Sequence, residues 1–154
     1  MKVILAERKG IPDTSVRPGR VSFTTALQTS TVLMLTLPLS PETQSLIATP
    51  EFALMRPDAL FINVARGGIV VEPDLVAALK EGKIARAATD VFIEEPAGME
   101  NVLVKAANEE WSRGRLVLTP HAAWFARSSI EKLRGTTKEN IEAWARGEPQ
   151  NLVL

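Results

Sequence analysis

The sequence predicts an α/β protein built on a parallel β-sheet with flanking helices. Short apolar runs bounded by turn residues do not alternate with polar residues, which is typical of strands buried on both faces of a parallel sheet. Stretches with helical periodicity separate these runs, and strands that alternate with helices form βαβ units. The predicted strands are Val3–Ala6, Val32–Leu37, Ala59–Val64, Ile84–Thr89 and Leu116–Thr119.

The segments between the strands predict the helices. Pro73 suits the start of a helix and Gly82 suits its end, with apolar residues between them at a spacing of three to four. A longer helix is expected to begin near Ser128 or Ser129 and to end before Gly147. Shorter helical pieces are expected at Ser40–Ile47 and Thr49–Met55.

The segment from Ala97 to Arg115 has no clear periodicity. It is polar, is interrupted by glycine, and contains Trp111. We expect a long surface loop or a short helix there, and long loops are often functional or form interfaces.

Length and composition exclude several classes of protein. The 154 residues, of which 45% are hydrophobic and 23% charged, predict one globular domain over residues 1–154. Lys plus Arg and Asp plus Glu each number 18, so there is no charge excess to attract nucleic acid or an anionic membrane. The longest apolar run is interrupted by Thr36 and Pro38 and is too short to span a bilayer. We therefore expect a cytoplasmic protein that binds neither nucleic acid nor a membrane.

The small number of cysteine and histidine residues limits the possible chemistry. There is no Cys, so disulfides, thiolate nucleophiles and zinc-thiolate sites are excluded. There is one His, so any histidine chemistry must use His121. We expect no metal site, and the absence of Cys fits a reducing compartment.

Polar side chains follow each predicted strand at the point where it ends. In open parallel sheets, ligands bind at the carboxyl ends of the strands, so these residues are the candidates for a site. Each of them also has a structural explanation: a surface turn, a cap, a solvated charge or a hydrogen-bonding histidine. Their shared position at successive strand ends favours the functional interpretation. The candidates are Glu7, Arg8, Pro38, Arg66, Asp90, Glu95 and His121.

Three motifs in this order resemble the NAD-binding domain of the D-isomer-specific 2-hydroxyacid dehydrogenases. They are Leu60-Phe-Ile-Asn-Val-Ala-Arg-Gly-Gly-Ile-Val-Val, Asp90-Val-Phe-Ile-Glu-Glu-Pro and Leu118-Thr-Pro-His-Ala-Ala-Trp. The resemblance covers nearly the whole chain and is similar above all to the glycerate dehydrogenase and hydroxypyruvate reductase branch. It implies a Rossmann-type sheet and an oxidoreductase that transfers a hydride between nicotinamide and a small 2-oxo or 2-hydroxy acid.

The resemblance also implies roles for individual residues. Arg66, Glu95 and His121 match the catalytic residues of the family. An Arg can hold a 2-oxo acid by two parallel hydrogen bonds, an imidazolium can protonate its carbonyl oxygen, and a carboxylate behind the ring can orient the ring and favour its charged form. The implied cofactor-binding residues are Glu7, Arg8, Pro38, Ala65, Asp90 and Ala123.

Two of these residues have more specific expectations. Asp90 matches a position near the nicotinamide carboxamide, and Glu7 matches the acidic residue that meets the adenosine ribose. We expect NAD as the cofactor, because the Glu7 carboxylate would repel a 2′-phosphate. NADP is the alternative, since Arg8 and Lys9 would attract one.

One departure from the family pattern shapes the remaining expectations. No Gly-x-Gly-x-x-Gly occurs in the chain, and Val3 follows directly after Met1 and Lys2. The sequence therefore predicts an incomplete sheet that begins at the second Rossmann strand, without the first strand and its glycine-rich turn. We expect the isolated chain to be inactive or impaired, because the cofactor pyrophosphate has lost its helix N-terminus.

The predicted gap in the sheet leads to an expectation about assembly. Unpaired backbone groups would flank the missing strand. Val3–Ala6 could shift into the vacant place, two chains could exchange strands or pair their edges, or a separate polypeptide could supply the missing piece. Of these, we expect a homodimer. The alternative functions are a non-catalytic remnant that binds nucleotide or dimerises, and a different α/β enzyme of flavodoxin-like topology.

Overall fold

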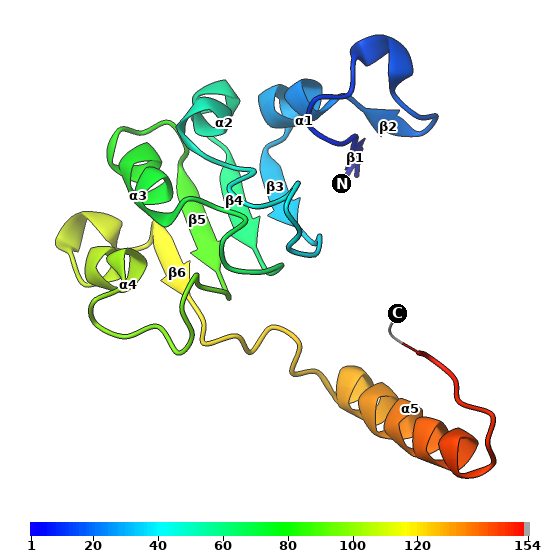
Figure 1. The fold of residues 1–154 in the computed structure, drawn as a ribbon. Helices are drawn as coiled ribbons and strands as arrows, with labels where there is room; N and C mark the ends of the chain where they lie inside the picture. Colours follow the sequence, from blue (N-terminus) through cyan, green and yellow to red (C-terminus); the bar gives the residue numbers. More distant parts are fainter. Residues whose placement is uncertain (153–154) are drawn as a thin grey trace. The chain divides into compact units, whose positions relative to one another are not determined.

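A four-stranded parallel sheet forms the centre of the fold. The structure is a computed structural model that describes residues 1–152. The sheet contains β3 (Val32–Leu35), β4 (Leu60–Asn63), β5 (Arg86–Thr89) and β6 (Leu116–Leu118), in the spatial order β3-β4-β5-β6 (Figure 1). All neighbouring pairs are parallel, and the last residues of β3 and β4 pair with each other, as do those of β4 and β5 and of β5 and β6. The predicted parallel α/β fold is confirmed.

A second, two-stranded sheet lies apart from the first. It pairs β1 (Leu5–Ala6) with β2 (Arg20–Val21), also in parallel. The predicted strand Val3–Ala6 is thus shorter than expected, and β2 is a strand that the sequence did not predict. Among residues 1–152, β1 is not hydrogen-bonded to β3, so the shift of Val3–Ala6 into the vacant place was wrong. The two sheets are separated where the missing first strand was expected.

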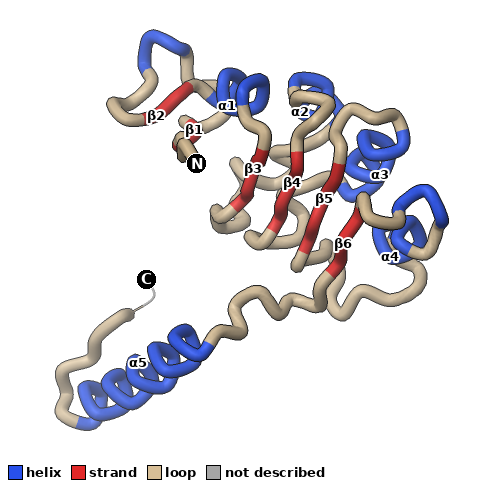
Figure 2. The backbone as a smooth tube through the Cα atoms, turned by 180° about the vertical axis from the view of Figure 1, so that it is seen from behind, coloured by secondary structure: helices blue, strands red, loops and turns tan. Residues whose placement is uncertain are grey.

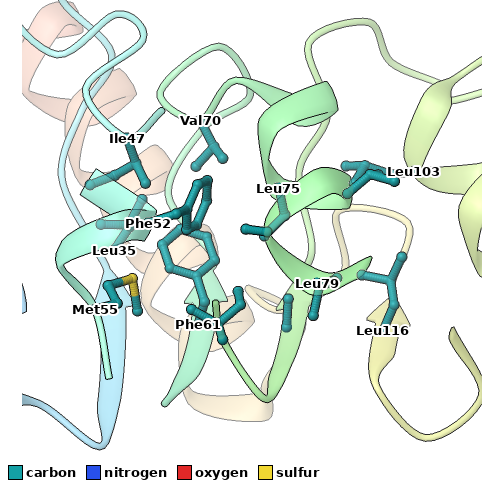
Figure 3. Close-up of a cluster of buried hydrophobic side chains, with 14 of the residues drawn as sticks. Leu35, Ile47, Phe52, Met55, Phe61, Val70, Leu75, Leu79, Leu103 and Leu116 are labelled. Atoms are coloured by element: carbon teal, nitrogen blue, oxygen red, sulfur yellow. The ribbon is translucent and has the colours of Figure 1, made fainter. Parts of the chain in front are cut away.

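Four helices cover one face of the four-stranded sheet, as Figures 1 and 2 show. They are α1 (Phe23–Thr29), α2 (Thr49–Leu54), α3 (Glu72–Lys80) and α4 (Val102–Ala107), with short 3-10 turns at Asp13–Ser15 and Glu110–Ser112. The core between the helices and the sheet is apolar, because alternate strand residues point into it. Figure 3 labels ten of its members: Leu35, Ile47, Phe52, Met55, Phe61, Val70, Leu75, Leu79, Leu103 and Leu116.

The other face of this sheet corrects a second expectation. Within residues 1–121, the helices cover one face only, and Val32, Met34 and Val117 on the other face are 43%, 53% and 56% exposed. The expectation that the apolar strands are buried on both faces by this part of the chain was therefore wrong. An apolar run alone does not reveal which of its faces a helix covers.

One segment between strands differs from its prediction, and another agrees with it. Ser40–Ile47 forms turns and not a helix: the Thr43 hydroxyl bonds backbone groups of Ser40 and Pro38, and Ile47 forms a parallel bridge to Val70. These local bonds replace helical ones. Ala97–Arg115, expected as a loop or a short helix, contains α4, whose N-terminus is capped by the Asn101 side chain.

Residues 122–152 form a second compact unit. It contains α5 (Arg127–Ala145), which begins within two residues of the predicted start. Gly147, at φ +78°, follows the end of the helix as predicted, because glycine adopts this left-handed conformation without strain. Within residues 1–152, no helix is long and apolar enough to cross a membrane.

Candidate active site

The carboxyl ends of β4, β5 and β6 bring together the predicted site residues of the first unit. The backbone N–H of Asp90 donates to the carbonyl of Asn63 at 2.9 Å, and the N–H of His121 donates to the carbonyl of Asp90 at 2.8 Å. These bonds continue the sheet pairing beyond the last strand residues. As a result, the loops that carry Arg66, Asp90 and His121 start from the same edge, as the sequence predicted.

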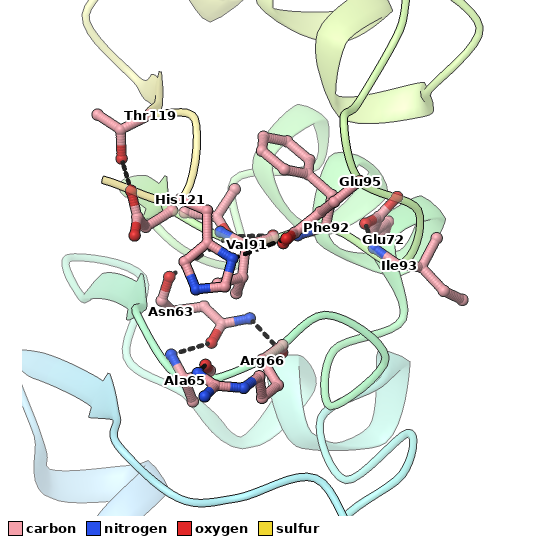
Figure 4. Close-up of polar contacts among 12 residues, drawn as sticks. Asn63, Ala65, Arg66, Glu72, Val91, Phe92, Ile93, Glu95, Thr119 and His121 are labelled. Carbon is pink, nitrogen blue, oxygen red and sulfur yellow. Dashed lines mark hydrogen bonds and ion pairs between the residues drawn. The ribbon is translucent and has the colours of Figure 1, made fainter. Parts of the chain in front are cut away.

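His121 and Glu95 form an ion pair at this edge (Figure 4). Nδ1 of the imidazole lies 2.7 Å from Oε2 of Glu95, and Oε1 of Glu95 accepts the backbone N–H of Phe92 at 2.9 Å. The hydrogen bond from His121 lowers the pKa of Glu95, and the Phe92 N–H and the charge of Arg66 act in the same direction. Since an ionised carboxylate only accepts hydrogen bonds, Nδ1 carries the proton, and Nε2 is left for another partner.

The backbone of His121 adopts an uncommon conformation. Its φ is +51°, in the left-handed region that non-glycine residues rarely occupy. Its N–H is bonded to Asp90 and its ring to Glu95, so the surrounding contacts hold it there. Backbone strain of this kind concentrates at functional sites, which supports the choice of His121 as a site residue.

The loop that carries Arg66 is fixed by the side chain of Asn63. The Asn63 amide oxygen accepts the N–H of Ala65 at 3.1 Å, and its nitrogen donates to the carbonyl of Arg66 at 3.3 Å. The Arg66 guanidinium is exposed and donates one bond, from Nη1 to the carbonyl of Ala65 at 2.6 Å. Arg66 therefore keeps further donors for a ligand at the end of β4.

Gly67 holds this loop against the segment that carries Glu95. A Cβ at Gly67 would lie 1.7 Å from the carbonyl oxygen of Phe92, so no side chain fits at this position. The backbone of the Arg66 loop and that of the Glu95 segment are in direct contact as a result. This contact holds the backbone of the Arg66 loop close to the segment that carries Glu95.

Glu72, at the start of α3, forms hydrogen bonds that hold the same segment in place. It is buried, and its carboxylate accepts the N–H of Ile93 at 2.8 Å and the side-chain amide of Asn101 at 2.8 Å. Neither Glu72 nor Asn63 was predicted as a site residue from the sequence. A signal existed for Asn63, because it is the one amide inside an apolar run, whereas nothing local distinguishes Glu72 from an ordinary first-turn carboxylate.

The remaining predicted residues occupy different places. Asp90 is buried, and its carboxylate accepts a hydrogen bond from the Thr119 hydroxyl. Ala65 is buried beside Arg66, and Pro38 is exposed after β3. Ala123 belongs to the second unit, so its role stays a prediction.

Glu7 and Arg8 follow β1, at the carboxyl end of the small sheet. Glu7 is buried and forms a two-point ion pair with Arg17, whereas Arg8 is exposed. Among residues 1–152, no hydrogen bond or ion pair joins this end to Arg66, Glu95 or His121. The structure therefore separates the candidate residues into a set at β4–β6 and a set at β1.

Within residues 1–152, no group of three or more His, Cys, Asp or Glu side chains is arranged to hold a metal ion.

A known protein family matches most of the chain. Residues 1–123 match the family described as "D-isomer specific 2-hydroxyacid dehydrogenase, NAD binding domain". The chain is 37% identical over 141 residues to a glycerate dehydrogenase of Methylorubrum extorquens. This match covers 92% of this chain and 43% of that protein. It thus spans less than half the length of this relative.

Solved structures of similar fold include proteins with either nicotinamide cofactor. An acyclic imino acid reductase in complex with NADPH and D-arginine matches 100% of this chain and 46% of its own, with a TM-score of 0.78 and 27% identity. A D-lactate dehydrogenase with NAD+ from Lactobacillus jensenii matches 98% of this chain and 48% of its own, with a TM-score of 0.74 and 26% identity. The chain belongs to the D-isomer specific 2-hydroxyacid dehydrogenase family.

Proposed function

We propose that this chain provides the cofactor-binding domain and the catalytic side chains of an NAD(P)-dependent dehydrogenase. Its reaction interconverts a small 2-oxo acid and the corresponding 2-hydroxy acid. The observation that carries the proposal is the 2.7 Å ion pair of His121 and Glu95, which shares a sheet edge with the exposed guanidinium of Arg66. These residues fit a nicotinamide next to a 2-oxo acid, since they combine an oriented proton donor with a free cation.

His121 acts as the proton donor in the proposed reduction. A nicotinamide cofactor held at this edge would supply the hydride for the carbonyl carbon. The imidazolium gives the proton at Nε2 to the carbonyl oxygen, so that one hydride and one proton are added to the substrate. Glu95 accepts a hydrogen bond from Nδ1 throughout, which keeps the ring oriented. In the oxidation direction, the neutral ring takes the proton back.

Arg66 binds the substrate in this scheme. A guanidinium presents two parallel donors that match a carboxylate, and a 2-oxo acid places a carbonyl oxygen beside its carboxylate. Holding both groups aligns the carbonyl with the proton donor. Asp90, Ala65, Pro38 and Ala123 are proposed to line the cofactor, with Asp90 near the carboxamide.

We also propose a homodimer located in the cytoplasm. Among the described residues β3 pairs only with β4, so its other edge offers backbone groups to a second chain. The absence of Cys fits a reducing compartment. Sedimentation at micromolar concentration should give twice the mass of the chain, and a monomer at that concentration would refute the proposed dimer.

The proposed activity can be tested with a fusion protein. The N-terminal segment of the Methylorubrum extorquens glycerate dehydrogenase, up to the start of its match, is placed before Met1. We expect this fusion to oxidise NADH or NADPH with glyoxylate or hydroxypyruvate. The 154 residues alone should give little turnover, because hydride transfer needs reacting atoms about 3–3.5 Å apart and the chain contains no Gly-x-Gly-x-x-Gly. A folded fusion that binds NADH but reduces neither acid would contradict the proposal.

A further inference from the structure

Lys9 joins the loop after β1 to the connection between β3 and β4. Its Nζ lies 2.8 Å from Oε1 of Glu51, in the first turn of α2, and donates to the carbonyl of Leu46 at 3.4 Å. Among residues 1–152, β1 and β3 are not paired as strands. The contacts of Lys9 therefore link the two sheets across the place where the sequence predicted a missing strand.

The partner of Lys9 is itself firmly held. Glu51 is 5% exposed, and its Oε2 accepts the N–H of Ala48 at 3.0 Å, so both carboxylate oxygens are engaged. The next residue of α2, Phe52, is part of the core. Because a buried carboxylate that loses its cation stays uncompensated, this pair is more costly to break than an exposed one. Glu51 thus anchors the loop after β1 to α2.

The same connection between β3 and β4 also supports the loop of Arg66. The N–H of Ser45 donates to the carbonyl of Gly68 at 2.8 Å, and Ile47 and Val70 form a parallel bridge. Gly68 follows Arg66 by two residues. One short segment of chain is therefore bonded on one side to the loop after β1 and on the other side to the loop of Arg66.

We propose that Lys9 is a positioning residue that sets the spacing between the two ends of the cofactor site, the end of β1 and the edge that carries Arg66. This inference rests on the proposed function, because it requires a dinucleotide that spans both ends. Two linked ligand groups strengthen each other's binding only where the geometry lets both engage at once. Lys9 should therefore matter for the whole dinucleotide and not for either of its halves.

Titrations of the 154-residue chain test the inference without any turnover. The ligands are NAD+ and its two halves, adenosine 5′-monophosphate and nicotinamide mononucleotide, and NMR spectroscopy detects their binding even where it is weak. We expect Lys9→Gln to lower the affinity for NAD+ at least about fivefold, because the advantage of linked groups is lost when their sites are not held at the right spacing. The affinity for each half should stay unchanged.

Further variants separate the spacing from a general loss of structure. Glu51→Gln should have the same effect as Lys9→Gln, and the double variant should add little, because both changes remove one contact. Lys9→Arg should keep part of the NAD+ affinity, since arginine also pairs with a carboxylate. The matched control is Lys105→Gln, because Lys105 forms an ion pair of 2.7 Å with the exposed Glu100. Circular dichroism shows whether each variant is folded.

Each other outcome decides the question differently. Equal losses for NAD+ and both halves would indicate a purely structural role and overturn the inference, as would an unchanged NAD+ affinity in Lys9→Gln. NAD+ that binds the parent chain no more tightly than its halves would also overturn it, while the fusion protein tests the proposed function separately. If none of the three ligands binds, the proposed cofactor-binding role is refuted together with the inference. Should Lys9→Gln fail to fold, the same comparison with Glu51→Gln decides.

Discussion

Nδ1 of His121 lies 2.7 Å from Oε2 of Glu95, and the two residues come from different loops at one edge of the sheet. The pair is partly open, with side chains 37% and 34% exposed. The pair is therefore accessible both to a substrate and to solvent. Its geometry defines which imidazole nitrogen bears the exchangeable proton, and the expected effects of replacing Glu95 or His121 depend on that assignment.

Replacing Glu95 should slow the reaction of the fusion protein without preventing cofactor binding. Glu95→Gln keeps the shape of the side chain and removes the charge that stabilises the imidazolium. We expect kcat to fall by at least about tenfold, since general acid catalysis contributes about 10²–10⁴-fold. Steady-state kinetics with hydroxypyruvate measure this. The neighbouring Glu94→Gln is the matched control, and equal effects of the two changes would contradict the role of Glu95.

A methyl group at Gly67 should disturb the contact between the two loops. Its Cβ would lie 1.7 Å from the Phe92 carbonyl oxygen, so the backbone must move. We expect Gly67→Ala to lower the free energy of unfolding by about 1–3 kcal/mol, the usual cost of overpacking. Chemical denaturation measures the change. Gly98→Ala is the control, because no atom lies within 4 Å of the added Cβ, and a similar loss there would refute the explanation.

Removing the Glu72 carboxylate should destabilise the segment that carries Glu95. Glu72→Ala leaves the N–H of Ile93 and the Asn101 amide without their acceptor. We expect a loss of about 1–3 kcal/mol in unfolding free energy, the cost of unsatisfied buried polar groups. Thermal unfolding monitored by circular dichroism would show it. Glu81→Gln, at the opposite end of the same helix, should change stability little, and stability unaffected by Glu72→Ala would count against the bracing role.

The Glu7–Arg17 pair should give the chain a specific dependence on acid. The pKa of Glu7 falls from 4.5 to about 2 on folding, because the Arg17 side chain bonds the charged form. A carboxyl with a lowered folded pKa contributes stability above its unfolded pKa and loses it as pH falls through the folded value. The difference in stability between the wild type and Glu7→Gln should thus be constant above about pH 4.5 and shrink toward pH 2. Denaturation at a series of pH values measures it, and a constant difference down to pH 2 would contradict this assignment.

The sheet and the position of Arg66, Asp90 and His121 could be predicted from the sequence. Apolar runs identify parallel strands, and parallel strands bring their carboxyl ends to one edge whatever the loops do. The loops themselves could not be predicted. Thr43 takes over backbone hydrogen bonds within Ser40–Ile47, and a helical spacing does not reveal such competition.

The state of Glu7 was likewise hidden in the sequence. Arg17 lies ten residues away in a loop without periodicity, and only the folded loop brings its guanidinium to the carboxylate. The positive φ of His121 is also invisible in the sequence. Residue types and strand ends therefore suggested the site, whereas its hydrogen bonds required the structure.

The central claim is that His121 donates the proton, and one comparison tests it most directly. The fusion protein and its His121→Asn variant are first titrated with NADH, to show that both bind the cofactor equally, and are then assayed with hydroxypyruvate. We predict that the variant keeps its NADH affinity and loses at least about 10²-fold in kcat, the contribution of a positioned general acid. A variant that binds NADH and reduces hydroxypyruvate at the rate of the parent fusion would contradict the account.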